Sequence, residues 1–482
     1  MSASDPLWLV FGASGYVGRN MVAHLAAQGR RVRAAARRLS AMEAEGWQGV
    51  DQVRADALDP ATLSAALAGV EVAFYLVHSM GGGRGFPARD REAARNFAQA
   101  AAQAEVRRIV YLGGLAPDQA DTEHLASRVE TGTILRAGPV PVIELRAGII
   151  IGPGSAAFEV MRDLVGHLPV MVTPRWVRVS SPPIALADLL ADLVALAARP
   201  EAEGQVFETG GPERLTYEAM MHGVARALGQ RKPVILPVPF LTPKLSSYWM
   251  DLVTGVPAPL ARALIGGLRH DLRADDTALR ALVPRDCLGF DAAVEKAFEA
   301  ERDMLSGDRW REGAFDLRGH RHDISFYGKR MTLARDCAAP PAAVWRALEG
   351  LTTRAAGYFA LTPVWRLRAA ADRWMGGANA GPRLHAGSFT EGETFDFWRV
   401  HRVRSGKGLI LLSRLRAPGE GGMEITVEPS ATGGSRIGLV LHWHPAGVWG
   451  LLYWYLLWPA HAVVLRAFLR GLARASTQER MS

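Results

Sequence analysis

The chain has 482 residues, more than one hydrophobic core usually organises, so we expect two or three domains. Hydrophobic residues make up 49% of the sequence and charged residues 22%, a globular composition that excludes a disordered or fibrous chain. The net charge is +8, but the arginines are spread along the chain without basic blocks, so we predict no nucleic-acid partner.

The N-terminal segment combines a strand, a glycine-rich turn and a helix. An apolar run at residues 7–11 ends at Gly12, Gly15 and Gly18 follow at three-residue spacing, and residues 21–27 have a helical pattern. Glycine lets the backbone approach a pyrophosphate, and the helix start presents N–H groups to the negative charge. The segment therefore predicts a dinucleotide site. Its predicted residues are Gly12, Ser14, Gly15, Tyr16, Val17 and Gly18.

Strand and helix patterns alternate through the next part of the chain. The expected strands span residues 31–36, 72–77, 108–112 and 140–145, and the expected helices span residues 61–67 and 90–104. This alternation predicts a doubly wound parallel sheet with helices on both faces, an α/β fold. Ligands lie outside the carboxyl ends of such strands. The cofactor site is therefore predicted to include Val77, His78, Ser79, Gly113 and Gly114.

The residues after the second strand indicate which dinucleotide is bound. An NAD site usually has an acidic residue there for the ribose hydroxyls, whereas this sequence has Arg37 and Arg38. Two arginines can pair with a 2′-phosphate, so we predict NADP(H) as the cofactor. The alternative, NAD(H), stays open if both arginines are solvated loop residues. Asp56 either accepts a hydrogen bond from the adenine amine or caps the helix that follows.

Prolines interrupt the pattern from about residue 150, and we interpret residues 150–305 as a substrate lobe of a first domain, 1–305. A linker is predicted at residues 306–325, and a second domain at residues 326–482. The second domain is expected to have a helix at residues 340–348, an antiparallel sheet and a long C-terminal helix. Its expected strands span residues 393–403, 408–415, 422–427 and 435–443.

The C-terminal helix, residues 448–475, allows two interpretations. Residues 448–465 contain no Asp, Glu, Lys or Arg, which is long enough for a membrane span. Gly450 and Pro459 interrupt this run and arginines recur after it, so we favour a helix buried against its own sheet. Peripheral membrane contact through this helix is the alternative.

Targeting and metal signals are weak. Residues 1–6 lack the basic and apolar regions of a signal peptide, so we expect a cytoplasmic protein. With only Cys287 and Cys337, no disulfide framework or cysteine metal site is predicted. His442 and His444 share one face of a predicted strand but have no third ligand nearby, so we predict no metal.

Several motifs together with the glycine loop resemble atypical short-chain dehydrogenases/reductases. They lie at residues 74–80, 111–115, 124–128 and 145–154, and the resemblance covers about residues 6–300. It is strongest to NmrA-like proteins and to the NADPH-binding Rossmann subunit of respiratory complex I, and it implies a Rossmann fold. The C-terminal part is similar to the START/Bet v1-like (SRPBCC) helix-grip fold, an α+β domain, which implies that it encloses an apolar ligand.

The resemblance also shows what this sequence lacks. Short-chain dehydrogenases use a Ser or Thr, a Tyr and a Lys, whereas here Gly113 and Gly114 replace the hydroxyl, His124 the Tyr and Arg128 the Lys. Arg128 can hold a ribose or phosphate but stays charged, and His124 can act as a general acid near neutral pH. The resemblance thus implies an oxidoreductase that reduces a carbonyl or quinone-like apolar substrate, with His124 and Arg128 as catalytic residues. The alternative is a non-catalytic NADPH-binding redox sensor, ligand-binding or assembly protein.

Overall fold

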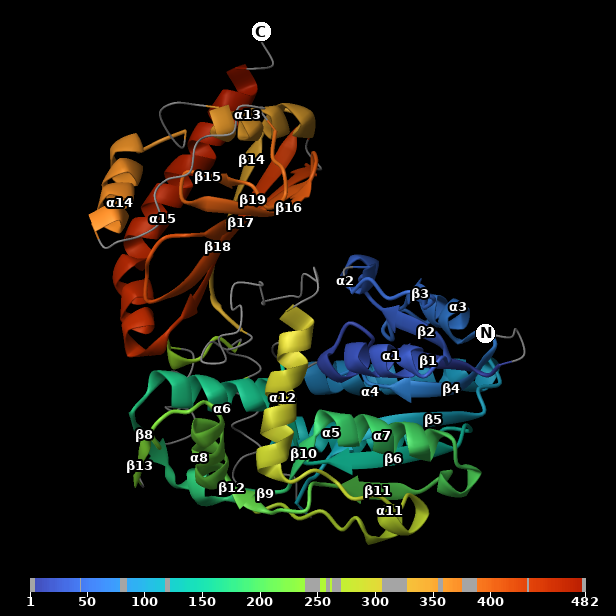
Figure 1. Ribbon diagram of the computed structural model, residues 1–482. Coiled ribbons are helices and arrows are strands. Elements are labelled where there is room, and N and C mark those ends of the chain that lie inside the picture. The colour runs from blue at the N-terminus through green and yellow to red at the C-terminus, as the bar shows by residue number, and fades with distance from the viewer. Residues whose placement is uncertain are drawn as a thin grey trace. The chain divides into compact units, whose positions relative to one another are not determined.

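The computed structural model describes residues 5–43, 45–78, 85–117, 122–238, 252–256, 261, 270–305, 327–353, 359–374, 388–430 and 433–478. The chain divides into two compact units, Met1–Glu312 and Gly313–Ser482 (Figure 1). The predicted linker at residues 306–325 lies outside the described residues.

The first unit is built on a seven-stranded parallel sheet in the order β11-β6-β5-β4-β1-β2-β3. Its strands are β1 (Leu7–Phe11), β2 (Arg31–Ala36), β3 (Asp51–Arg54), β4 (Val70–Tyr75), β5 (Arg108–Gly114), β6 (Val142–Ala147) and β11 (Val206–Thr209). The chain runs outward from β1 to β3 and returns to β4 on the other side of β1. The strand order therefore reverses between β1 and β4, where doubly wound sheets bind ligands.

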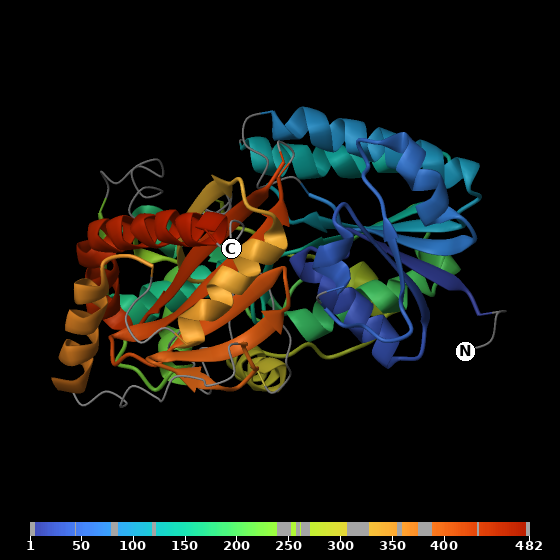
Figure 2. The same ribbon diagram turned by 90° about the horizontal axis from the view of Figure 1, so that it is seen from above.

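Helices cover both faces of this sheet. They are α1 (Tyr16–Ala27), α2 (Leu39–Glu43), α3 (Leu63–Leu67), α4 (Phe86–Gln103), α5 (Glu123–Arg136) and α7 (Leu186–Ala197). Successive residues of a strand point to opposite faces, so Trp8 and Val10 of β1 pack in the cluster with α1 and α7. Leu9 and Phe11 pack in the other cluster, with α3 and α4. Figure 2 shows helices on both faces of the sheet. The predicted doubly wound Rossmann fold is confirmed.

The segment after β6, which its prolines predicted to be irregular, contains several helices and short strands. It adds three small sheets, which pair β10 (Pro183–Ala185) with β7 (Ile149–Ile151), β12 (Leu215–Thr216) with β9 (Ser180–Ser181), and β13 (Val234–Val238) with β8 (Val170–Pro174). Its helices are α6 (Ala156–His167), α8 (Tyr217–Ala227), α11 (Thr277–Leu282) and α12 (Phe290–Leu305).

A buried ion pair joins α12 to α6 in this lobe. Both terminal nitrogens of Arg162 donate to the carboxylate of Glu301, at 3.2 and 3.0 Å, and both side chains are almost fully buried. Glu159 lies beside them and accepts the Gly154 N–H at 2.9 Å. Bidentate geometry and extra hydrogen bonds are what such charges need to offset the cost of desolvation.

The second unit has a six-stranded antiparallel sheet in the order β14-β19-β18-β17-β16-β15. The strands are β14 (Lys329–Cys337), β15 (Thr394–Phe395), β16 (Trp398–Arg404), β17 (Gly408–Ser413), β18 (Gly419–Pro429) and β19 (Ser435–Pro445). The helices are α13 (Pro341–Thr353), α14 (Thr362–Trp374) and α15 (Gly447–Gln478). The antiparallel sheet and the C-terminal helix were predicted, whereas β14 and α14 were not.

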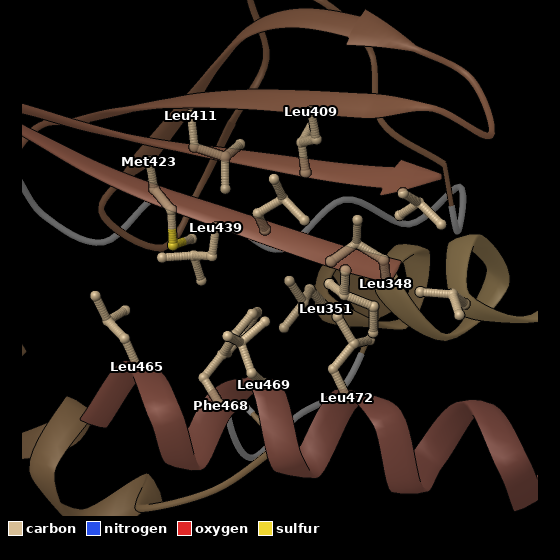
Figure 3. Close-up of a cluster of buried hydrophobic side chains, with 14 of the residues drawn as sticks. Leu348, Leu351, Leu409, Leu411, Met423, Leu439, Leu465, Phe468, Leu469 and Leu472 are labelled. Carbon is tan, nitrogen blue, oxygen red and sulfur yellow. The ribbon is translucent and has the colours of Figure 1, made fainter. Parts of the chain in front are cut away.

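The two halves of α15 have different surroundings. Its C-terminal half packs on the sheet through Leu465, Phe468, Leu469 and Leu472, which face Leu409, Leu411, Met423 and Leu439 (Figure 3). Its N-terminal half leaves several large apolar side chains exposed. They are Val448, Trp449, Leu452, Tyr455, Leu456 and Trp458. The helix is long and apolar enough to cross a membrane, and only 28% of its apolar window is buried. Gly450, Leu451 and Trp454 of the N-terminal half are nevertheless buried, so the favoured buried helix describes α15 in part.

Candidate cofactor and active site

The loop between β1 and α1 has the shape that pyrophosphate binding needs. Gly12 has a φ of +94°, and a Cβ there would lie 3.0 Å from the Leu76 carbonyl group. A Cβ on Gly18 would overlap the carbonyl oxygen of Gly12. The loop therefore admits no side chain at either position, and α1 begins directly against the end of β1.

The start of α1 is open to an anion. Gly15 is the N-cap and supplies no side-chain hydrogen bond, and the first turn contains no acidic residue. The first N–H groups of a helix have no acceptor within it, and the helix dipole is positive at this end. The loop and the helix start therefore fit the pyrophosphate of a dinucleotide, with Ser14 exposed and Tyr16 and Val17 half-buried beside it.

The arginines predicted to select the cofactor follow β2 directly. Arg37 and Arg38 are both exposed, and β2 is the neighbour of β1, so their backbone lies beside the glycine loop. Asp56 has a different local role from the predicted helix cap: its carboxylate accepts the Leu58 N–H at 3.1 Å in a turn. The N-cap of the next helical turn is Asp59, so the capping alternative for Asp56 is wrong.

Three predicted residues meet at the carboxyl ends of β4 and β5, which are neighbours in the sheet. The imidazole centroids of His78 and His124 are 4.8 Å apart. The Arg128 guanidinium packs over Gly114, where a Cβ would lie 3.4 Å from Nε, and its Nη2 donates to the Leu112 carbonyl at 2.8 Å. Of the other predicted residues, Val77 is half-buried and Gly113 is buried, and Ser79 lies outside the described residues.

A buried carboxylate that the sequence analysis missed organises this cluster. Asp90 of α4 is 4% exposed, and its Oδ2 is 3.0 Å from the Ser127 hydroxyl, which donates to it, and 3.1 Å from His78 Nδ1. A carboxylate only accepts, so His78 carries its proton on Nδ1 and has a lone pair on Nε2. The sequence held a signal for Asp90, because it shares one helix face with Ala93, Ala94 and Phe97, where an apolar residue is expected.

Burial decides the charge of both imidazoles. Burial first, then the charge of Arg128 and the neighbouring His78, lowers the pKa of His124 to about 3. Burial also lowers the pKa of His78, against the opposing effect of the hydrogen bond that His78 donates to Asp90. Both rings are therefore neutral at pH 7, so a general-acid role for His124, which stays a prediction, would begin from the neutral ring.

The same imidazoles carry unused hydrogen-bonding atoms. Among the described residues, neither nitrogen of His124 has a hydrogen-bond partner, and neither does Nε2 of His78. Buried polar atoms are normally paired, and such exceptions with perturbed pKa values gather at functional sites. The arrangement offers neutral donors and acceptors beside one cation. Within the described part of the chain, no group of three or more His, Cys, Asp or Glu residues is placed to hold a metal.

Comparisons with protein families agree with the division into two units. Residues 12–137 match a family described as NAD(P)H-binding. Residues 329–468 match a family described as a protein of unknown function, DUF2867.

Two curated relatives are reductases. The chain is 30% identical over 266 residues to a (4-alkanoyl-5-oxo-2,5-dihydrofuran-3-yl)methyl phosphate reductase of Streptomyces griseus, covering 53% of this chain and 84% of the relative. It is 27% identical over 233 residues to a ceramide reductase of Caulobacter vibrioides, covering 48% of this chain and 73% of the relative. Among solved structures, an NADPH-dependent quinone oxidoreductase of Escherichia coli complexed with NADPH is 21% identical, with a TM-score of 0.49, covering 61% of this chain and 99% of that one.

The glycine contact gives a test of cofactor binding. We expect Gly18→Ala to weaken NADPH binding at least tenfold and to lower the unfolding free energy by about 1–3 kcal/mol, because its Cβ would force α1 away from β1. Gly408→Ala in β17 is the matched control, since Gly408 has no left-handed φ and its Cβ would lie 3.6 Å from the nearest atom. Titration by fluorescence and thermal unfolding measure the two effects. Wild-type affinity in Gly18→Ala would contradict this account of the loop.

Proposed function

This chain belongs to the NAD(P)H-binding, NmrA-like short-chain dehydrogenase family, and from that premise we propose that it is an NADP(H)-dependent reductase. Its first unit is an NAD(P)H-binding, reductase-like Rossmann domain. The observation that carries the proposal is the side-chain-free loop at Gly12 and Gly18. It lies at the same carboxyl ends of the strands as His78, His124 and Arg128.

Bound NAD(P)H supplies a hydride. In place of the family's Tyr, a neutral His124 ring can donate an N–H to a substrate oxygen and stabilise the charge that develops there. The Arg128 guanidinium adds positive charge nearby. Asp90 and Ser127 hold His78, whose Nε2 can accept a hydrogen bond from a water molecule. The proton that completes the reduction then comes from solvent, because a neutral imidazole gives up its own proton poorly.

We infer an apolar substrate with a carbonyl, quinone or conjugated double bond. Support comes from the two relatives, since one is a reductase of an alkanoyl-substituted oxo-dihydrofuran that carries a methyl phosphate and the other is a ceramide reductase. Neutral donors beside a cation suit a polarised oxygen.

One observation favours the alternative of a non-catalytic NADPH-binding sensor or assembly protein. The Ser, Tyr and Lys of the family are all absent, and the His124 ring is not protonated at neutral pH. In that case the cofactor stabilises the first unit and reports redox state without turnover. Turnover with aldehydes and quinones therefore decides between the two functions.

We propose that Arg37 and Arg38 select NADP(H) over NAD(H). Replacing both by Gln is expected to weaken NADPH binding about tenfold or more, since each charge-assisted hydrogen bond contributes roughly 1.5–3 kcal/mol, and to leave NADH binding unchanged. Arg107→Gln is the control, because Arg107 pairs with Glu71 at the amino end of β5. Fluorescence titration with each nucleotide is the measurement. Equal binding of the two nucleotides by the wild-type chain would refute the preference.

The catalytic role of His124 predicts a distinctive pH profile. His124→Gln should lower kcat for NADPH oxidation by about a hundredfold or more, whereas His24→Gln on α1 should not. Since the His124 pKa of about 3 lies below the ordinary 6.5, the ring is neutral from pH 5 to 8, and we expect no loss of rate around pH 6.5. Steady-state rates with decanal and menadione across this range test both points. If the wild-type rate instead falls as the pH rises through 6.5, and this fall disappears in His124→Gln, His124 acts as an imidazolium acid.

We further propose that the second unit is a START/Bet v1-like helix-grip domain. Its antiparallel sheet packed on a long C-terminal helix supports this. We infer that the protein is cytoplasmic and touches membranes peripherally through the exposed apolar side chains of the N-terminal half of α15.

Vesicle flotation tests this contact. Trp449→Gln with Leu456→Gln should lower the fraction bound to phosphatidylcholine–phosphatidylglycerol vesicles about tenfold, because the two side chains are 74% and 80% exposed and would lose apolar contact with lipid. Leu236→Gln on β13, also exposed, is the control. This contact would be excluded if the wild-type protein does not bind the vesicles, or if the double substitution leaves binding unchanged. Retention of the protein in cell membranes after alkali washing would instead indicate a spanning helix.

A further inference from the structure

The second unit contains an apolar cavity that the cofactor chemistry does not use. It has a volume of about 370 Å³ and lies between the sheet, α14 and α15. Its inner wall is made by Trp365, Phe397, Trp398, Met423, Trp454 and Leu465. Figure 3 shows Met423 of β18 and Leu465 of α15 on facing sides of the hydrophobic cluster. Pockets of this size and lining hold small or single-chain organic ligands.

The cavity reaches the surface at α14. Leu367 lines it and is 71% exposed, and Val364 and Ala460 also combine lining with exposure. Trp398, by contrast, is a buried part of the lining, with 4% of its surface exposed. Its indole N–H has no hydrogen-bond partner among the described residues. The space therefore extends from an open apolar mouth to a buried interior.

One permanent charge lies on the described lining, which is mostly apolar but also includes Ser413, His442, Tyr453 and His461. Arg368 of α14 is half-buried, and its Nη2 donates a hydrogen bond to the Tyr453 hydroxyl at 3.2 Å. No Asp or Glu is among the described residues that line the cavity. Burial lowers the pKa of His442 and of His461, the latter with help from Arg368, so both imidazoles are neutral at pH 7.

No carboxylate among the described residues pairs with Arg368, and an anion that reaches its half-buried guanidinium would offset the cost of desolvating that charge. A guanidinium matches a carboxylate with two parallel hydrogen bonds, and Tyr453, which accepts from Arg368, still has its own proton to donate. We propose that the cavity binds a single-chain amphiphile with a carboxylate head, the class of a long-chain fatty acid. The chain lies among the aromatic side chains and the carboxylate binds Arg368 and Tyr453.

Titration of the delipidated full-length protein with oleate, followed by tryptophan fluorescence, tests this site. Oleate below its aggregation concentration should give a saturable change, and oleyl alcohol should bind at least tenfold more weakly. Arg368→Gln should weaken oleate binding about tenfold while leaving oleyl alcohol within twofold. Arg466→Gln, an exposed arginine of α15 outside the lining, is the matched control.

A second variant keeps the test independent of charge. Ala460→Trp places a bulky group at the mouth, on an exposed position where folding should be preserved, and should weaken both ligands. Circular dichroism confirms that each variant folds. The proposal is overturned if oleate gives no saturable change, if the alcohol binds as well as the acid, or if Arg368→Gln binds oleate like the wild type.

Discussion

The absence of a Cβ at Gly12 and Gly18 is the constraint on which the first unit's site depends. It lets the first turn of α1 lie against the carbonyl oxygen of Gly12, at the end of the central strand. Two hydrogen bonds, from the N–H groups of Gly12 and Ala13 to the Ala35 carbonyl, tie the same loop to β2. A third, from the Leu76 N–H to the Phe11 carbonyl, ties the end of β4 to β1. Arg37 and Arg38 after β2, and His78 after β4, therefore lie at the same end of the sheet as the start of α1.

Cofactor binding and proton transfer make opposite demands on this edge. A pyrophosphate needs backbone N–H groups and positive charge, which the loop and the positive end of the helix dipole supply. An acid that works at neutral pH needs a pKa near 7. Burial lowers the pKa of His124, and the positive charge of Arg128 lowers it further. An Arg in the place of the family's Lys therefore favours binding and electrostatic stabilisation over proton donation.

Most of the first unit could be predicted from the sequence, because its signals are local. Apolar runs, glycine spacing and helical periodicity are short-range patterns, and they located β1, β2, β4, β5 and α4 to within a few residues. The Asp90–His78–Ser127 group was not predicted, because its residues come from a strand end and two helices that are brought together only in the folded unit. The neutral state of His124 was missed for the same reason: a pKa depends on burial, which is a property of the whole fold.

The second unit shows why hydropathy alone does not reveal what an apolar residue does. In α15, Phe468 and Leu472 fill the core, Trp454 and Leu465 belong to the same core cluster but also line the cavity, and Leu456 faces outward. All five are apolar, so hydropathy does not separate them. The surroundings of each side chain in the folded unit do. An apolar helix that both bounds a cavity and exposes its outer face can give a lipid ligand a path from a bilayer to an interior site without crossing water.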